Sequence, residues 1–256
     1  MSLQLTGIHH LTAITANAPE NLRFYTQVLG LRLVKKTVNQ DDTSAYHLFY
    51  ADGLASPGTD LTFFDWPVGH ERRGTHSVSR TGLRVANLAT LEWWKARFSE
   101  LKVRAGDIRD VGGRASLDFE DGEGQRFRLT VDDSGAPSHP WQKSPVPAEH
   151  QIKGLGPITL SVPDIRNTEI VLVHVMNMTE TATYPNPEGE GVVHVFSMGD
   201  GGPAAELHVA VEPDLPAAHQ GAGAVHHVAF RAPDEAALHA WTERLRGFRL
   251  PSSGEV

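Results

Sequence analysis

Two short segments at opposite ends of the chain decide the fold. Residues 7–14 read Gly-Ile-His-His-Leu-Thr-Ala-Ile, and residues 225–231 read Val-His-His-Val-Ala-Phe-Arg. Both are rich in β-branched, aromatic and other apolar residues, which is typical of strands. Each holds a histidine doublet, and the chain has no other such doublet. The match between the two ends indicates a repeated unit, which has to be identified before any fold is assigned.

Two further segments, residues 78–85 and 156–162, have the same form. Each of the four is followed by a loop containing Asn, Asp or Pro and then by apolar residues at helical spacing, near residues 19–29, 88–101, 165–178 and 238–247. The corresponding points in the four strands are His10, Thr81, Thr159 and His227. Their intervals of 71, 78 and 68 residues give a nearly constant period.

Alternating, β-rich runs follow the first three helices. The expected strands cover residues 31–38, 45–51 and 60–65 in the first repeat, 115–119 and 125–131 in the second, and 192–198 and 204–211 in the third. Each repeat therefore has the order βαβββ, which predicts an α+β fold. The fourth repeat is short, because Gly254, Glu255 and Val256 follow its helix directly. Either the chain is truncated there, or the protein has lost the end of its last module.

The division into domains follows the same repeats. Residues 1–136 hold the first two modules, and residues 151–256 hold the third and the incomplete fourth. Residues 137–150, which are rich in Pro and Ser, are the expected linker.

Composition excludes several classes of protein. Hydrophobic residues make up 40% of the chain and charged residues 21%, which fits a folded globular protein. The net charge is −8 with no basic run, so nucleic acid is not an expected partner. The absence of cysteine removes thiol nucleophiles, Cys-based zinc sites and iron–sulfur clusters. Residues 1–11 do not resemble a signal peptide and residues 170–176 are too few to span a membrane, so we expect a cytoplasmic protein that binds no membrane.

The histidine doublets are the candidate site. Successive side chains of a strand point to opposite faces, so one histidine of each doublet can enter a shared cavity. Parity selects His10, which shares a face with Ile8 and Thr12, and His227. Two neutral imidazoles that converge suit a divalent metal. The alternative is a pair of core histidines bonded to backbone carbonyls, and the matched positions favour the metal site.

The other histidines carry weaker signals. His47, on the expected strand 45–51, is interpreted as a packing residue, although it could also face the cavity. The run at residues 199–202 is interpreted as a hairpin turn rather than a phosphate loop, because no helix follows it. No nucleophile elbow, Walker A motif or dinucleotide fingerprint is present.

The chain resembles a known family in several places. They are the strand at residues 7–14, the run Phe-Tyr-Thr-Gln-Val-Leu-Gly-Leu at 24–31, Tyr-His-Leu-Phe-Tyr-Ala-Asp at 46–52, Pro-Gly-Thr at 57–59, and Val-His-His-Val-Ala-Phe at 225–230. Together they resemble the vicinal oxygen chelate (glyoxalase/bleomycin resistance/dioxygenase) superfamily, and more narrowly its four-module ring-cleaving dioxygenases that act on hydroquinones. The resemblance covers essentially the whole chain.

This resemblance implies two half-barrel sheets, one pairing the first module with the fourth and the other the second with the third. It also implies one Fe(II), or alternatively Mn(II), bound by two histidines and a glutamate. His10 and His227 match the histidine ligands, while Thr12, His9 and His226 match positions beside them. The glutamate belongs to the last strand of the fourth module, expected about residue 275 and beyond Val256. Glu255 comes too early to serve.

The implied activity is extradiol-type cleavage of a hydroquinone-like aromatic diol, with dioxygen as co-substrate. His226 or Thr12 would orient groups or transfer protons. With two protein ligands alone, we expect the chain as given to bind metal poorly or to be inactive. The alternatives are another metal-dependent enzyme of the superfamily, a lyase or isomerase, and a non-catalytic small-molecule binding protein. A homodimer is a further expectation by analogy.

Overall fold

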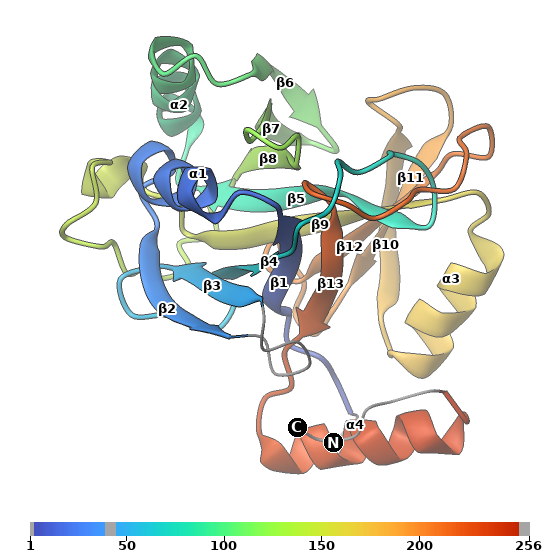
Figure 1. Ribbon diagram of the computed structural model, residues 1–256. Helices are drawn as coiled ribbons and strands as arrows, with labels where there is room; N and C mark the ends of the chain where they lie inside the picture. The colour runs from blue at the N-terminus through green and yellow to red at the C-terminus, as the bar shows by residue number, and fades with distance from the viewer. Residues whose placement is uncertain (1–2, 39–44, 251–256) are drawn as a thin grey trace.

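The computed structural model describes residues 3–38 and 45–250 and contains two mixed β-sheets (Figure 1). The first sheet has five strands in the order β13-β1-β4-β3-β2. These strands are β1 (Ile8–Thr15), β2 (Arg32–Val38), β3 (Tyr46–Ala51), β4 (Asp60–Asp65) and β13 (Val225–Phe230). The strand from the far end of the chain therefore lies beside the first strand.

The second sheet has eight strands in the order β10-β11-β12-β9-β5-β8-β7-β6. They are β5 (Ser77–Val85), β6 (Ala105–Val111), β7 (Arg114–Glu120), β8 (Arg126–Val131), β9 (Gly154–Val162), β10 (Thr179–Pro185), β11 (Val192–Ser197) and β12 (Glu206–Val211). Strands β5 and β9 pair in antiparallel fashion at its centre.

One pairing rule is repeated three times. The first strand of each module pairs in parallel with the last, as β1 with β4, β5 with β8, and β9 with β12. Modules then join through antiparallel first strands, β5 with β9 in one sheet and β1 with β13 in the other. The predicted α+β fold of βαβββ modules is confirmed. Strand β13 and the helix after it are the described part of the fourth module, and Gly254, Glu255 and Val256 lie outside the described residues.

The helices follow the first strands, as the spacing predicts. They are α1 (Ala18–Arg23), which continues as a π-helical turn at Phe24–Val28, α2 (Leu88–Glu100), α3 (Arg166–Ile170), which continues likewise at Val171–Val175, and α4 (Glu235–Gly247), with a short 3₁₀ turn at Ala148–His150. Asn17, Asn87 and Asp234 cap α1, α2 and α4, each accepting a bond from the backbone N–H three residues ahead. Such caps satisfy donors that a helix start leaves unpaired.

Aromatic side chains from both sheets share one core. The Tyr25 ring stacks on Tyr50 with 5.1 Å between centroids and lies 6.1 Å from Phe127 of the other sheet. Its hydroxyl donates to Asp121 at 2.8 Å, so the buried oxygen has a partner. This packing fixes the two sheets relative to each other.

The Pro-rich segment between the second and third modules packs against the protein. Val146 is buried, and the Ser144 hydroxyl donates to the carbonyl of Gly30 in the first module. The division into residues 1–136, 137–150 and 151–256 stays a prediction. No helix in the described ranges is both long enough and apolar enough to cross a membrane.

A buried polar chain joins β7, β10 and β12. Arg114 donates to both oxygens of Glu206 at 2.6 and 2.7 Å, His208 Nε2 lies 3.1 Å from Glu206, and Tyr184 Oη lies 2.8 Å from His208 Nδ1. Burial raises the pKa of Glu206, but hydrogen bonds from His208 and Arg114 outweigh it and bring that pKa to about 2. Glu206 is therefore ionised in the folded protein over the whole physiological range.

This network predicts a pH dependence of stability. Because the pKa of Glu206 falls from 4.5 to about 2 on folding, its contribution is complete above the unfolded pKa and is lost as pH falls through 4.5 toward 2. Glu206→Gln should lower the free energy of unfolding at neutral pH by about 3 kcal/mol, and the gap to wild type should narrow by about 1 kcal/mol at pH 3.5. Urea unfolding at neutral pH and at pH 3.5 measures the free energy of unfolding of both proteins. The exposed variant Glu243→Gln serves as the control, and an equal gap at both pH values would contradict the assignment.

Candidate metal-binding site

The pairing of β1 with β13 brings the two histidine doublets together. Thr12 lies opposite His227 and His10 opposite Ala229, so His10 and His227 are diagonal neighbours. Their ring centroids are 5.5 Å apart and the rings meet edge to face at 82°. Residues separated by 217 positions in the sequence thus form one pair.

A chain of hydroxyl groups anchors this pair. Thr12 Oγ1 lies 3.0 Å from His227 Nε2 and 2.8 Å from Thr62 Oγ1, and Thr62 Oγ1 lies 2.9 Å from His47 Nε2. Through Thr12 of β1 and Thr62 of β4, this network holds the His227 ring in place. It also includes His47, which the sequence favoured as a packing residue.

The other histidine of each doublet contacts its neighbour. His9 Nδ1 lies 3.0 Å from His10 Nδ1, and His226 Nδ1 lies 2.8 Å from His227 Nδ1. In each pair one nitrogen must donate and the other accept, so the doublets restrict each other's tautomers. His9 and His226 therefore lie where they can orient His10 and His227.

Aromatic rings form a wall beside His226. Phe64 stacks on Trp66 with 4.9 Å between centroids, and the His226 ring lies 5.3 Å from Phe64 and 5.6 Å from Trp66. His226 itself is exposed. A flat aromatic ligand could pack here with a polar group at its edge.

The histidines favour their neutral forms. Burial, and then the nearby His227, His9 and His47, lower the pKa of His10 to about 4. Burial, then His227 and Lys35, lower the pKa of His47 to about 4, and burial and His226 lower the pKa of His227. Neutral imidazole is the form that binds metals.

The spacing of the pair fits one shared ion. At the usual N–metal distance of about 2.0–2.1 Å, each ring centre lies about 3.2 Å from the ion, so two centres up to about 6.4 Å apart can share it. The observed 5.5 Å is within that limit. In the described part of the chain, no group of three His, Asp or Glu side chains lies close enough to hold a metal.

The sequence did not identify the contribution of β4. Because β4 runs parallel to β1 in register, Thr62 and Phe64 lie on the same face as the histidine pair. The alternation of side chains within residues 60–65 was the available signal. It shows which side chains face the histidines only when the neighbouring strand is known. Trp66 follows β4, and no sequence pattern indicated that it lies beside the histidines.

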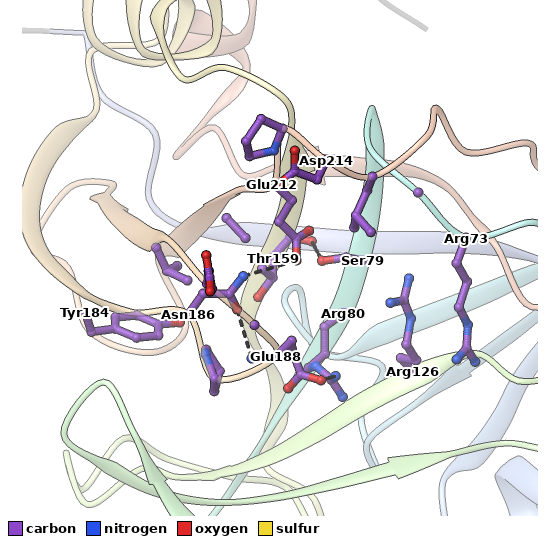
Figure 2. A pocket seen from close by; sticks show the side chains of 18 of the residues that line it. Arg73, Ser79, Arg80, Arg126, Thr159, Tyr184, Asn186, Glu188, Glu212 and Asp214 are labelled. Atoms are coloured by element: carbon purple, nitrogen blue, oxygen red, sulfur yellow. Dashed lines mark hydrogen bonds and ion pairs between the residues drawn. The ribbon is translucent and has the colours of Figure 1, made fainter.

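One cavity borders the second histidine doublet at His226, and another lies on the other sheet. One of about 370 Å³ is bordered by Val225 and His226 and extends toward β5 and β9. Another, of about 460 Å³, lies on the eight-stranded sheet and contains none of the paired histidines (Figure 2). The histidine pair itself is half-buried.

Comparisons with known proteins agree with this geometry. The model of the "Glyoxalase/Bleomycin resistance protein/Dioxygenase superfamily" matches residues 7–129 and 154–251. The chain therefore belongs to this superfamily, as the sequence resemblance predicted.

Three proteins whose names include the word dioxygenase are similar to the chain. The chain is 46% identical to the "Putative ring-cleaving dioxygenase MhqA" of Bacillus subtilis (strain 168), over 99% of this chain and 81% of that protein. It is 29% identical to the "Chlorohydroquinone/hydroquinone 1,2-dioxygenase" of Sphingobium indicum, over 90% of this chain and 72% of that protein. A crystal structure titled as a "putative dioxygenase" of Bacillus subtilis superposes with a TM-score of 0.85 at 29% identity, covering 96% of this chain and 76% of that one.

Proposed function

We propose that this protein is a ring-cleaving dioxygenase that uses Fe(II) and dioxygen to open a hydroquinone-like aromatic diol. The observation that carries the proposal is the pairing of His10 and His227, with rings 5.5 Å apart on adjacent strands. The 46% identity to a protein named as a ring-cleaving dioxygenase supports the same reaction class. The relative named for chlorohydroquinone and hydroquinone supports the substrate class.

His10 and His227 would hold the metal, and the residues that the structure describes bring no third His, Asp or Glu close enough to join them. Fe(II), when bound, would bring phenolate and dioxygen together and pass electron density from the ring to oxygen. Thr12 holds the His227 ring through its hydroxyl at 3.0 Å. His9 and His226 fix the tautomers of the two ligand histidines.

The aromatic wall would bind the substrate ring. Phe64 and Trp66 offer stacked faces beside His226, whose exposed imidazole can accept the proton that a phenol releases. In the overall reaction one ring C–C bond breaks, and both atoms of dioxygen enter the product, as a carboxylate and a carbonyl. Oxygen consumption is therefore stoichiometric with loss of the diol.

Oxygen uptake tests the proposal directly. Because two histidines alone would bind metal weakly, the protein is purified without oxygen and kept in excess Fe(II). It should then consume one dioxygen per hydroquinone converted, and EDTA should abolish the uptake. Mn(II) loading identifies the preferred metal by comparison. Conversion of a substrate without oxygen uptake would instead indicate a lyase or isomerase of the superfamily and would overturn the proposal.

A second candidate is a non-catalytic binding protein for small aromatic molecules. It is favoured by the hydrogen bonding of His227, since Thr12 occupies Nε2 and His226 occupies Nδ1, and a metal would have to displace one of them. Binding of hydroquinone with no bound iron and no oxygen uptake would support this candidate against the dioxygenase.

A further inference from the structure

The eight-stranded sheet has a cavity of its own, whose lining includes none of the paired histidines. It measures about 460 Å³, which is within the range of small-molecule sites, and side chains from β5, β8, β9, β10 and β12 contribute to its lining. Figure 2 shows polar side chains from these strands and the adjoining loops around one space. Nothing in the proposed ring cleavage uses this cavity.

Three of its four arginines are paired with carboxylates, Arg73 among them through Glu120 at 3.1 Å. Arg80 lies 3.1 Å from Glu188, and Arg128 lies 2.6 Å from Asp118. Arg109 reaches both of these carboxylates, at 2.7 Å to Asp118 and 2.6 Å to Glu188. Three guanidinium groups thus share two carboxylates, and this cluster keeps an excess of one positive charge.

Arg126 is the exception among these arginines. Its backbone pairs with Glu120 of β7, but within residues 3–38 and 45–250 no hydrogen bond or ion pair reaches its guanidinium. Burial lowers its pKa and Arg73 on the same wall lowers it further, while Glu71, Glu120 and Glu212 act in the opposite direction without a hydrogen bond or ion pair to it. Half-buried arginines normally have a bonded partner, so this one has five donors available to a ligand.

Arg73 extends the same basic wall. Figure 2 shows it beside Arg126. It is exposed and donates to the carbonyl of Gly124 at 2.7 Å, with Glu120 at 3.1 Å. Two planar guanidinium groups at one wall match a carboxylate or a phosphate.

An acceptor lies elsewhere in the lining. Glu212 accepts hydrogen bonds from Ser161 and from Asn186, the latter at 3.1 Å, and these bonds hold its carboxylate in place. The lining has four acidic residues, Glu188, Glu190, Glu212 and Asp214. They would repel a phosphate dianion, whereas a single carboxylate that carries a hydrogen-bond donor adds less negative charge and would satisfy both kinds of group. The lining therefore favours a carboxylate with a hydroxyl or amino group.

We propose that this cavity binds a small hydroxy- or amino-carboxylic acid, with its carboxylate on Arg126 and Arg73 and its donor group on Glu212. The site is independent of the metal site, and its ligand needs no iron. The neighbouring Tyr184 ring, whose hydroxyl is bonded to His208 at 2.8 Å, forms a fixed aromatic side of the cavity.

Calorimetric titration of the full chain in EDTA tests this proposal with 4-hydroxybenzoate as the probe. Its neutral analogue 4-hydroxybenzyl alcohol lacks the charge, benzoate lacks the donor, and inorganic phosphate represents the other anion class. We expect 4-hydroxybenzoate to bind, and each of the other three to bind at least about tenfold more weakly. Tighter binding of phosphate, or no binding of 4-hydroxybenzoate up to about 10 mM, would overturn the proposal.

Variants locate the bound probe. Arg126→Gln should weaken 4-hydroxybenzoate binding at least about tenfold, and Arg126→Lys by less, because the charge is retained. Arg166→Gln removes an exposed arginine that is paired with Asp164 outside the cavity and should bind as wild type does. His227→Ala should also leave binding unchanged. Loss of binding in His227→Ala with retention in Arg126→Gln would place the probe at the histidine pair and contradict the inference, and melting curves confirm that each variant is folded.

Discussion

His227→Ala is expected to lose both iron binding and oxygen uptake. His227 is one of the two imidazoles on adjacent strands, and its replacement leaves His10 as the remaining histidine of the pair. Because loss of an outer-shell partner already costs about 10–100-fold in metal affinity or activity, loss of a ligand should cost more than about 100-fold. Iron content after anaerobic reconstitution and the oxygen-uptake rate measure the effect.

Graded variants separate a ligand from a merely structural residue. His10→Ala should be as severe as His227→Ala. Thr12→Val, which removes the hydroxyl 3.0 Å from His227 while keeping its shape, should lose about tenfold. His194→Ala changes a histidine on the other sheet that is paired with Glu180, and it should match wild type. The ligand assignment fails if His227→Ala keeps normal iron content and activity.

Asp132→Ala is expected to cause the largest loss of stability. The Asp132 side chain is 1% exposed, accepts from Arg84 at 2.6 Å and lies 3.4 Å from the ammonium of Lys153. Its removal leaves two buried cations without their counter-ion. The free energy of unfolding should fall by about 3–5 kcal/mol, measured by urea denaturation at neutral pH.

Two control variants test whether charge burial is the cause. The double variant Arg84→Met/Asp132→Leu removes the closer ion pair and fills the space, leaving only Lys153 without its counter-ion, so it should lose less stability than Asp132→Ala. Asp107→Ala breaks an ion pair with Lys95 at the surface and should cause no measurable change. Equal losses in the single and double variants would indicate packing rather than charge.

The strands that the sequence missed share one property. Strands β6 (105–111) and β10 (179–185) are the two edges of the eight-stranded sheet, and nearly all their residues are exposed or half-exposed. An edge strand exposed in this way has no apolar alternation for a pattern to detect. The expected strands 60–65 and 125–131, by contrast, match β4 and β8 to within a residue, because their apolar residues are buried.

The helices also have some features that the sequence indicates and others that it does not. The expected ends of the first and third helices, at residues 29 and 178, include π-helical turns at Phe24–Val28 and Val171–Val175, which local spacing does not distinguish from an α-helix. The caps Asn17, Asn87 and Asp234 fall in the loops containing Asn, Asp or Pro that the sequence places before the helices, because a side-chain acceptor at a helix start is a local feature.

The sequence by itself determined the repeating unit, the α+β class and the two histidine doublets, since strand parity and helix spacing are local properties of the chain. Parity also selected His10 and His227 as the members of each doublet that face one another. Only the tertiary structure decided that β1 lies between β13 and β4, and this arrangement adds Thr62, Phe64 and His47 to the site. Contacts between strands far apart in sequence depend on sheet order and register, which no local pattern encodes.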